Sequence, residues 1–102
     1  MRRGEVWWYE VPRAGRRPFP ILTRDAAIPV LNQVLAVPAT RTIRGIPTEV
    51  PLVPDDGMPD ECVLTLDNVT VIRPALCTGR LTVRGSQRLA DICIALAVAV
   101  GR

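Results

Sequence analysis

Residues 16–24 read RRPFPILTR, in which two arginines and two prolines stand at the entrance of an apolar segment. Proline has no amide hydrogen to donate to a β-ladder, so strands that contain it lie at sheet edges or begin or bulge at the proline. Further prolines interrupt other strand-like segments at positions 38, 51 and 74. This pattern predicts a mostly β (α+β) chain folded as a small, strongly bent barrel rather than a flat sheet.

The chain repeats short strand-like segments over most of its length. Alternating and β-branched residues predict strands at 5–10, 18–23, 33–39, 48–53, 62–66, 68–73 and 77–84. Residues 25–32 are expected to form one short helical turn, broken at Pro29. We expect a single domain over residues 1–102. Trp7 and Trp8 should point to opposite faces of the first strand, one into the core and one to a rim or interface.

The last segment changes to helical periodicity. Ser86 can cap a helix that Gly101 is placed to end. The residues expected to form its core-facing stripe are Leu89, Ile92, Cys93, Leu96 and Val100. Ile94 and Val98 fall on the opposite side, although a terminal helix of a small domain is not buried all round. We therefore predict that Ile94 and Val98 contact a second copy of the chain or a bound peptide.

Cysteine content and apolar runs predict the compartment. Cys62, Cys77 and Cys93 are far apart and lack metal-type spacing, so they are interpreted as buried free thiols. The opening MRRGEVWWYE lacks the apolar stretch of a signal peptide, and the longest apolar run, residues 92–100, is too short to span a bilayer. The expectation is a cytoplasmic protein with no membrane partner.

Charge is segregated along the chain. Residues 1–44 carry a net +5, residues 45–70 a net −6 and residues 71–102 a net +4. Every one of the 13 basic residues is arginine, whose planar fork matches phosphate. Such a pattern favours an anionic partner such as RNA or DNA for one face. A genome-wide preference for arginine codons explains the absence of lysine equally well.

The inventory of reactive side chains excludes several classes of enzyme. The chain has no histidine, so the Ser-His triads and the commonest metal ligand are absent. The acidic stretch DDGMPDE at 55–61 departs from calcium-loop spacing and is interpreted as a solvated turn, so no metal or cofactor is expected. Arginines and hydroxyls remain. They suit phosphoryl chemistry in which the substrate supplies the nucleophile, as an RNA 2′-hydroxyl does.

Several motifs occur in a recognisable order. The first motif is RGEVW at 3–7. It is followed by a segment with Arg17, Pro18, Ile21 and Leu22 and by another with Val37, Pro38 and Thr40. CVLTLDNVTVI and a C-terminal helix come last. Over essentially the whole chain, this order resembles the MazF/PemK family of toxin endoribonucleases.

The resemblance implies a dimeric SH3-like β-barrel, the toxin of a type II toxin–antitoxin system with a MazE-like antitoxin. Such toxins cut single-stranded RNA at short motifs without metal and leave 2′,3′-cyclic phosphate and 5′-hydroxyl ends. By the same resemblance, Arg17 and Thr40 are the expected catalytic residues, and Asp67 and Asn68 the expected readers of base edges. The residues expected along the RNA path are Arg16, Arg24, Arg41, Thr42 and Arg44.

One departure and three alternatives stand beside this interpretation. Residues 10–15 are too few for the G-S-E type loop that family members commonly carry, which puts the cleavage sequence in doubt. Without the resemblance, Arg17 could be an ordinary surface arginine and Thr40 a strand-end hydroxyl.

Two other classes of protein share a small β-barrel. A CcdB-like gyrase poison would act through a tryptophan near the C-terminus, which residues 98–102 lack. A non-catalytic RNA-binding barrel would expose stacking aromatics, and beyond Trp7, Trp8, Tyr9 and Phe19 the chain has none.

Overall fold

The computed structural model describes residues 1–82 and 87–101. Its strands are β1 (Val6–Val11), β2 (Gly15–Pro20), β3 (Val34–Ala36), β4 (Ala39–Thr40), β5 (Glu49–Leu52), β6 (Cys62–Thr65), β7 (Thr70–Ile72) and β8 (Cys77–Thr82). The α-helix is α1 (Leu89–Ala99), and short 3₁₀ turns are η1 (Ile28–Val30), η2 (Pro54–Asp56), η3 (Leu66–Asn68) and η4 (Pro74–Leu76). The mostly β fold class with one C-terminal helix is confirmed.

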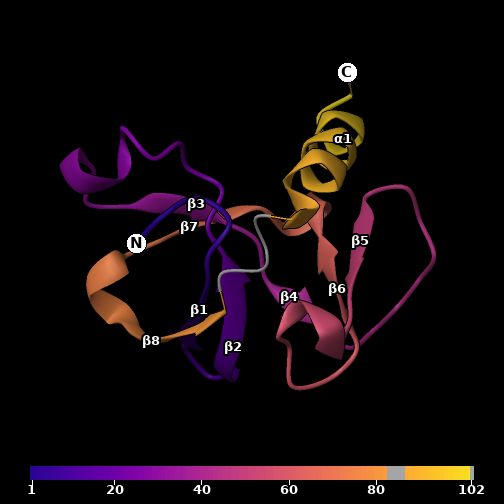
Figure 1. The fold of residues 1–102 in the computed structure, drawn as a ribbon, viewed down its shortest axis with the longest axis horizontal. Coiled ribbons are helices and arrows are strands. Elements are labelled where there is room, and N and C mark those ends of the chain that lie inside the picture. The colour runs from indigo at the N-terminus through magenta and orange to yellow at the C-terminus, as the bar shows by residue number, and fades with distance from the viewer. Residues whose placement is uncertain (83–86, 102) are drawn as a thin grey trace.

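The described strands form three small antiparallel sheets, ordered β2-β1-β8, β3-β7 and β4-β6-β5. In Figure 1 the first two sheets lie on one side of the molecule, and β4, β5 and β6 lie on the other with α1 above them. A single bridge between Ile21 and Ala36 continues β2 toward β3. Within the described residues the sheets do not close into a continuous barrel, which is where the expected architecture differs.

Prolines explain how the strands are arranged. Pro18 and Pro20 lie in β2, an edge strand of its sheet, and Pro51 lies in β5, also an edge strand. Edge positions tolerate residues that cannot donate to the ladder. The strand expected at 33–39 is split into β3 and β4 at Pro38, so the segment bends from one sheet to another. Pro29, expected to break a helical turn, instead lies inside η1 near its start.

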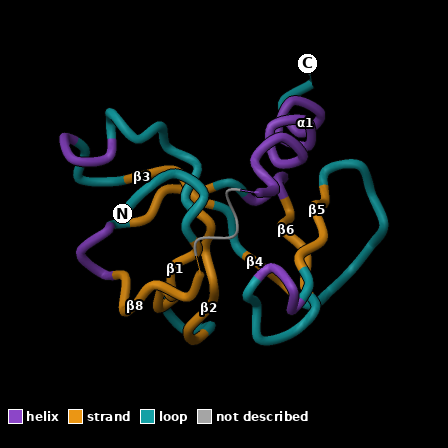
Figure 2. The backbone as a smooth tube through the Cα atoms, viewed as in Figure 1, coloured by secondary structure: helices purple, strands orange, loops and turns teal. Residues whose placement is uncertain are grey.

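The core has two parts, one on each side of the molecule. One cluster packs residues of β4, β5 and β6 against Ile92 and Ala95 of α1. The other packs Phe19 of β2 against residues of η1, β3 and β7, with Trp7 at its margin. The long connection between β4 and β5 contains neither helix nor strand (Figure 2).

The helix faces the core along a narrower stripe than expected. Ile92 and Ala95 are buried, but Cys93 and Val100 are exposed, so their expected burial was wrong. The reason is that α1 makes its most extensive contacts with η3 and β5, which cover one side of it. Gly101 follows α1 with φ 77°, as expected of the residue that ends a helix. The cap expected at Ser86 lies outside the described residues.

The cysteines also differ from expectation, because only Cys62 is buried while Cys77 is half-buried and Cys93 exposed. Along the described residues, no helix has both the length and the hydropathy needed to cross a membrane.

Glu5 anchors the N-terminal segment. Its Oε1 accepts hydrogen bonds from Arg2 N at 2.8 Å and Trp7 Nε1 at 3.1 Å, and its Oε2 pairs with Arg80 Nη1 at 3.3 Å. Burial raises the pKa of Glu5, but these hydrogen bonds outweigh it and hold the pKa below the ordinary value. Glu5 therefore ties the chain before β1 to β8 as a carboxylate.

Candidate active site

A cavity of about 340 Å³ lies where β2 approaches β4. Its walls come from β1, β2, β4, the residue after β4, residues 58–60 of the loop before β6, and Cys62 at the start of β6. Pockets of about 300–1,000 Å³ are typical of sites that hold small ligands. The two sequence-predicted catalytic residues, Arg17 and Thr40, both line this cavity.

Arg17 is positioned by a tight hairpin. Residues 12–14 connect β1 to β2, and Arg13 there has a left-handed φ of 66°. Arg17 pairs with Tyr9 of β1, and Pro18 follows with its φ fixed by its ring. Arg17 is exposed, and no carboxylate of the described residues lies within ion-pair distance of its guanidinium. The guanidinium fork is therefore available for an anion.

Thr40 lies on the other side of the cavity. It is half-buried in β4, and its backbone pairs with Val63 of β6. Its Oγ1 accepts a hydrogen bond from Thr42 N at 3.3 Å. A hydroxyl that already accepts a hydrogen bond still has its proton to donate. Thr40 can therefore donate to an oxygen held in the cavity.

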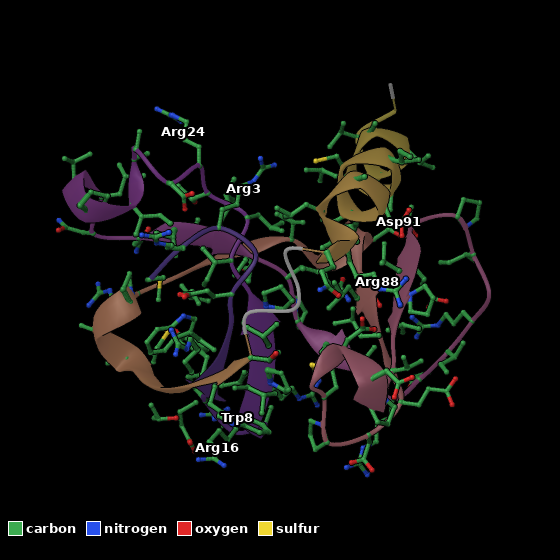
Figure 3. All side chains as sticks on the ribbon, in the orientation of Figure 1. Arg3, Trp8, Arg16, Arg24, Arg88 and Asp91 are labelled. Atoms are coloured by element: carbon green, nitrogen blue, oxygen red, sulfur yellow. The ribbon has the colours of Figure 1, made fainter. Side chains whose placement is uncertain are left out.

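The two other arginines of the cavity are already engaged. The Arg16 guanidinium lies over the Trp8 ring, 4.4 Å from the ring centroid (Figure 3). Arg41 Nη2 donates to Asp60 Oδ2 at 2.6 Å, although both side chains are exposed and such a pair contributes little to stability. Arg16, Arg17 and Arg41 still give the cavity a positive balance against the single carboxylate of Asp60.

Cys62 is the thiol at this cavity, and it stays neutral. Burial, reinforced by the carboxylates of Asp60 and Asp56, raises the pKa of Cys62 above its ordinary value of 9.0. Only a thiolate is strongly nucleophilic or metal-binding, so Cys62 acts as an apolar wall at neutral pH. Across the described part of the chain, no group of three or more Cys, Asp or Glu side chains is arranged to hold a metal ion.

Several residues expected along the RNA path do not line the cavity. Asp67 and Asn68 are exposed in η3, at the far end of β6 from Cys62, where Thr48 Oγ1 donates to Asp67 Oδ2 at 2.6 Å. Their reading of base edges stays a prediction.

Thr42 and Arg44 belong to the exposed loop after β4. Glu49 steadies this loop by accepting hydrogen bonds from Arg44 N and from Gly45 N at 2.8 Å. Arg24 lines a different groove together with Arg3, on the side away from Trp8 and Arg16 (Figure 3). The structure therefore assigns Arg24 no place beside Arg17.

The wall formed by Met58, Pro59 and Asp60 was not anticipated from the sequence. It is held by the buried carboxylate of Asp56, which accepts hydrogen bonds from Arg88 Nε and Nη2 at 3.2 Å each and from Val53 N at 3.0 Å. The hydrogen bond to Asp56 also raises the pKa of Arg88. A signal exists in the sequence, since PDDG at 54–57 is typical of a turn ending in a left-handed glycine. Nothing in that turn predicts its position beside β2.

Comparison with known proteins places the chain in one group. Residues 2–100 match the family model described as "PemK-like, MazF-like toxin of type II toxin-antitoxin system". The "Probable endoribonuclease MazF5" of Mycobacterium tuberculosis is 46% identical over 99 residues, covering 96% of this chain and 91% of the relative. The "Probable endoribonuclease MazF2" of the same species is 34% identical over 102 residues, covering 99% of each.

Solved structures give the same grouping. A structure titled "Endoribonuclease in complex with its cognate antitoxin from Mycobacterial species" superposes with a TM-score of 0.88 at 28% identity, covering 99% of this chain and 95% of the other. The "Mycobacterium tuberculosis toxin MazF-mt6" superposes with a TM-score of 0.84 at 26% identity, covering 94% and 95%.

Proposed function

The chain belongs to the PemK-like, MazF-like toxin family of type II toxin–antitoxin systems and is an endoribonuclease, and on this premise we propose that it cuts RNA in the cavity between Arg17 and Thr40. The observation that carries the assignment is the state of the three cavity arginines. Arg41 is paired with Asp60 and Arg16 lies on Trp8, whereas Arg17 has neither kind of partner among the described residues.

The proposed reaction uses a nucleophile from the substrate. The ribose 2′-oxygen attacks the adjacent phosphorus, a 2′-O–P bond forms, and the P–O5′ bond breaks. The 2′-hydroxyl gives up its proton to a water molecule and the departing 5′-oxygen takes one from water, which reaches the site because Arg17 is exposed, so the products carry a 2′,3′-cyclic phosphate and a 5′-hydroxyl. No side chain becomes covalently attached, which agrees with a cavity whose thiol is neutral.

Arg17 and Thr40 divide the work of stabilising the transition state. A guanidinium stays protonated in proteins, so Arg17 acts by holding the negative charge that develops on the phosphate oxygens. Thr40 donates its hydroxyl proton to a non-bridging oxygen. Strand pairing fixes the backbone of both residues, that of Arg17 in the β1–β2 hairpin and that of Thr40 against β6.

The proposed partners are single-stranded RNA, a cognate MazE-like antitoxin and a second copy of the chain, and the proposed site of action is the cytoplasm, where RNA is accessible. The structural neighbour solved with its cognate antitoxin supports the second of these. Ile94 and Val98 are 66% and 45% exposed on α1, as expected of residues that meet a partner. A CcdB-like gyrase poison has no support, because the curated relatives are named endoribonucleases.

The test compares two arginine variants on one long RNA. Arg17→Ala should lower the cleavage rate by about 100- to 1,000-fold, the loss typical of removing one donor that stabilises a developing oxyanion. Arg24→Ala removes the same charge at a distant groove and should cleave at the wild-type rate. Full activity in a folded Arg17→Ala protein would contradict the assignment.

A further inference from the structure

Trp8 is a large aromatic side chain that belongs to neither core cluster. Its neighbours along β1, Trp7 and Tyr9, pack against the second cluster, whereas Trp8 is half-buried and lines the cavity beside Arg17 and Thr40. Its indole N–H donates to no acceptor among the described residues, while that of Trp7 is bound to Glu5. An aromatic ring at the edge of an arginine-lined cavity, with an unused donor, is suited to a planar polar ligand.

The strand opposite Trp8 leaves room for such a ligand. Trp8 pairs with Pro18 of β2 on one side and with Gly79 of β8 on the other. Directly paired residues of antiparallel strands point to the same face of the sheet. Gly79 has no side chain, and a Cβ built there would meet no atom within 4 Å. The surface beside the Trp8 ring is therefore open on the β8 side.

Arg16 completes the arrangement. Its guanidinium lies 4.4 Å from the Trp8 ring centroid, and no carboxylate of the described residues lies within ion-pair distance of it, its cross-strand neighbour Glu10 included. Arginine beside an aromatic ring is a combination that single-stranded nucleic acids use, because the ring stacks a base while the cation meets the backbone. Asp60 and Arg41, on the opposite wall, are held by each other.

We propose that the open surface beside Trp8 is a nucleobase subsite, in which an unpaired base next to the scissile phosphate stacks on the Trp8 ring while Arg16 contacts the neighbouring phosphate. This inference rests on the proposed cleavage site at Arg17 and Thr40. It assigns to Trp8 and Gly79 a role in holding one nucleotide of the recognition sequence.

The chain's two tryptophans allow a direct binding test. Trp7→Phe leaves Trp8 as the sole tryptophan, and Trp8→Phe leaves Trp7. Each variant is titrated with an RNA carrying the wild-type cleavage sequence and a 2′-O-methyl group at the attacking ribose, which prevents cleavage. The fluorescence of the Trp7→Phe protein should be quenched saturably, and that of the Trp8→Phe protein should not change. Binding without quenching of Trp8 would overturn the subsite.

RNA affinity and the KM of cleavage give a second test, with variants of Trp8 and of residues in β8. Trp8→Ala should weaken RNA binding about 5- to 150-fold, the factor expected from losing one base–aromatic stack, and Trp8→Phe should restore most of it. Gly79→Val should fill the open surface and raise KM, whereas Thr78→Val, at the exposed residue before it that pairs with no residue of β1, should not. Equal effects of the two valine variants would contradict the subsite.

The two proposals fail in distinguishable ways. If the wild type cleaves RNA, Arg17→Ala does not, and Trp8→Ala binds and cleaves normally, only the subsite is wrong. If the wild type neither binds nor cleaves any RNA, the cleavage site is wrong and the subsite falls with it. Quenching of Trp8 by the antitoxin but not by RNA would give this surface to a protein partner and overturn the inference.

Discussion

Replacing Thr40 by valine removes one hydroxyl and nothing else from the proposed transition-state contacts. Valine has the same branched shape, so β4 should keep its pairing with Val63. The hydroxyl donates to a phosphate oxygen that carries charge in the transition state, and a hydrogen bond to a charged group contributes about 1.5–3 kcal/mol. The cleavage step should therefore slow by about 10- to 150-fold.

The same change should hardly affect folding. The hydrogen bond from Thr42 N to Thr40 Oγ1 is long at 3.3 Å, and Thr42 is exposed, so water can replace it. We expect the free energy of unfolding to fall by less than about 0.5 kcal/mol. The rate is measured at single turnover with enzyme in excess over a short RNA containing the cleavage sequence, and stability by urea titration.

Thr40→Ser is the matched control, because it keeps the hydroxyl and loses only a methyl group. It should cleave within a few-fold of the wild type. The reasoning is refuted if Thr40→Val is as active as Thr40→Ser, or if both lose activity in proportion to a loss of folded protein.

Three further predictions concern the rest of the molecule. The folded state lowers the pKa of Glu5, so this carboxylate stabilises the fold fully above its ordinary pKa of 4.5 and loses that effect as the pH falls through the lowered pKa. Glu5→Gln should therefore make the free energy of unfolding less dependent on pH at acid pH. An unchanged dependence would contradict this role of Glu5. Gly57→Ala should lower the free energy of unfolding by at least about 1 kcal/mol, because Gly57 has φ 89° and a Cβ there would collide with the Thr82 side chain. Urea titration measures this loss, and wild-type stability of the variant would show that the turn tolerates a side chain. Replacing Ile94 and Val98 together by glutamate should weaken self-association or antitoxin binding, measured by sedimentation and by titration with antitoxin; if neither changes, the exposed side of α1 meets no partner.

The strand pattern was the part of the fold most open to prediction. Most of the eight strands lie close to the ranges predicted from alternation and proline positions, because both of these signals depend on local sequence. Closure of the sheets and the orientation of α1 depend on contacts between distant segments. Cys93 follows Ile92 in the apolar periodicity, yet it is exposed because η3 and β5 cover only one side of the helix.

The candidate site could be predicted in part. Family motifs predict Arg17 and Thr40 as catalytic residues, and the structure brings both to one cavity, while their catalytic role stays a prediction. The wall at Met58 and Asp60 could not be foreseen, since the contact between Asp56 and Arg88 that holds it spans 32 residues. The contacts of Arg16 with Trp8 and of Arg41 with Asp60, which leave Arg17 as the cavity arginine without such a partner among the described residues, likewise depend on side-chain geometry.

The most direct test of the central claim is to map the ends produced when the purified wild-type protein cuts a long RNA in excess EDTA. A cleavage site at Arg17 and Thr40 that uses the substrate's own 2′-hydroxyl predicts cuts at one short motif, each leaving a 2′,3′-cyclic phosphate and a 5′-hydroxyl. Loss of cleavage in EDTA, or ends that carry a 5′-phosphate, would contradict this mechanism.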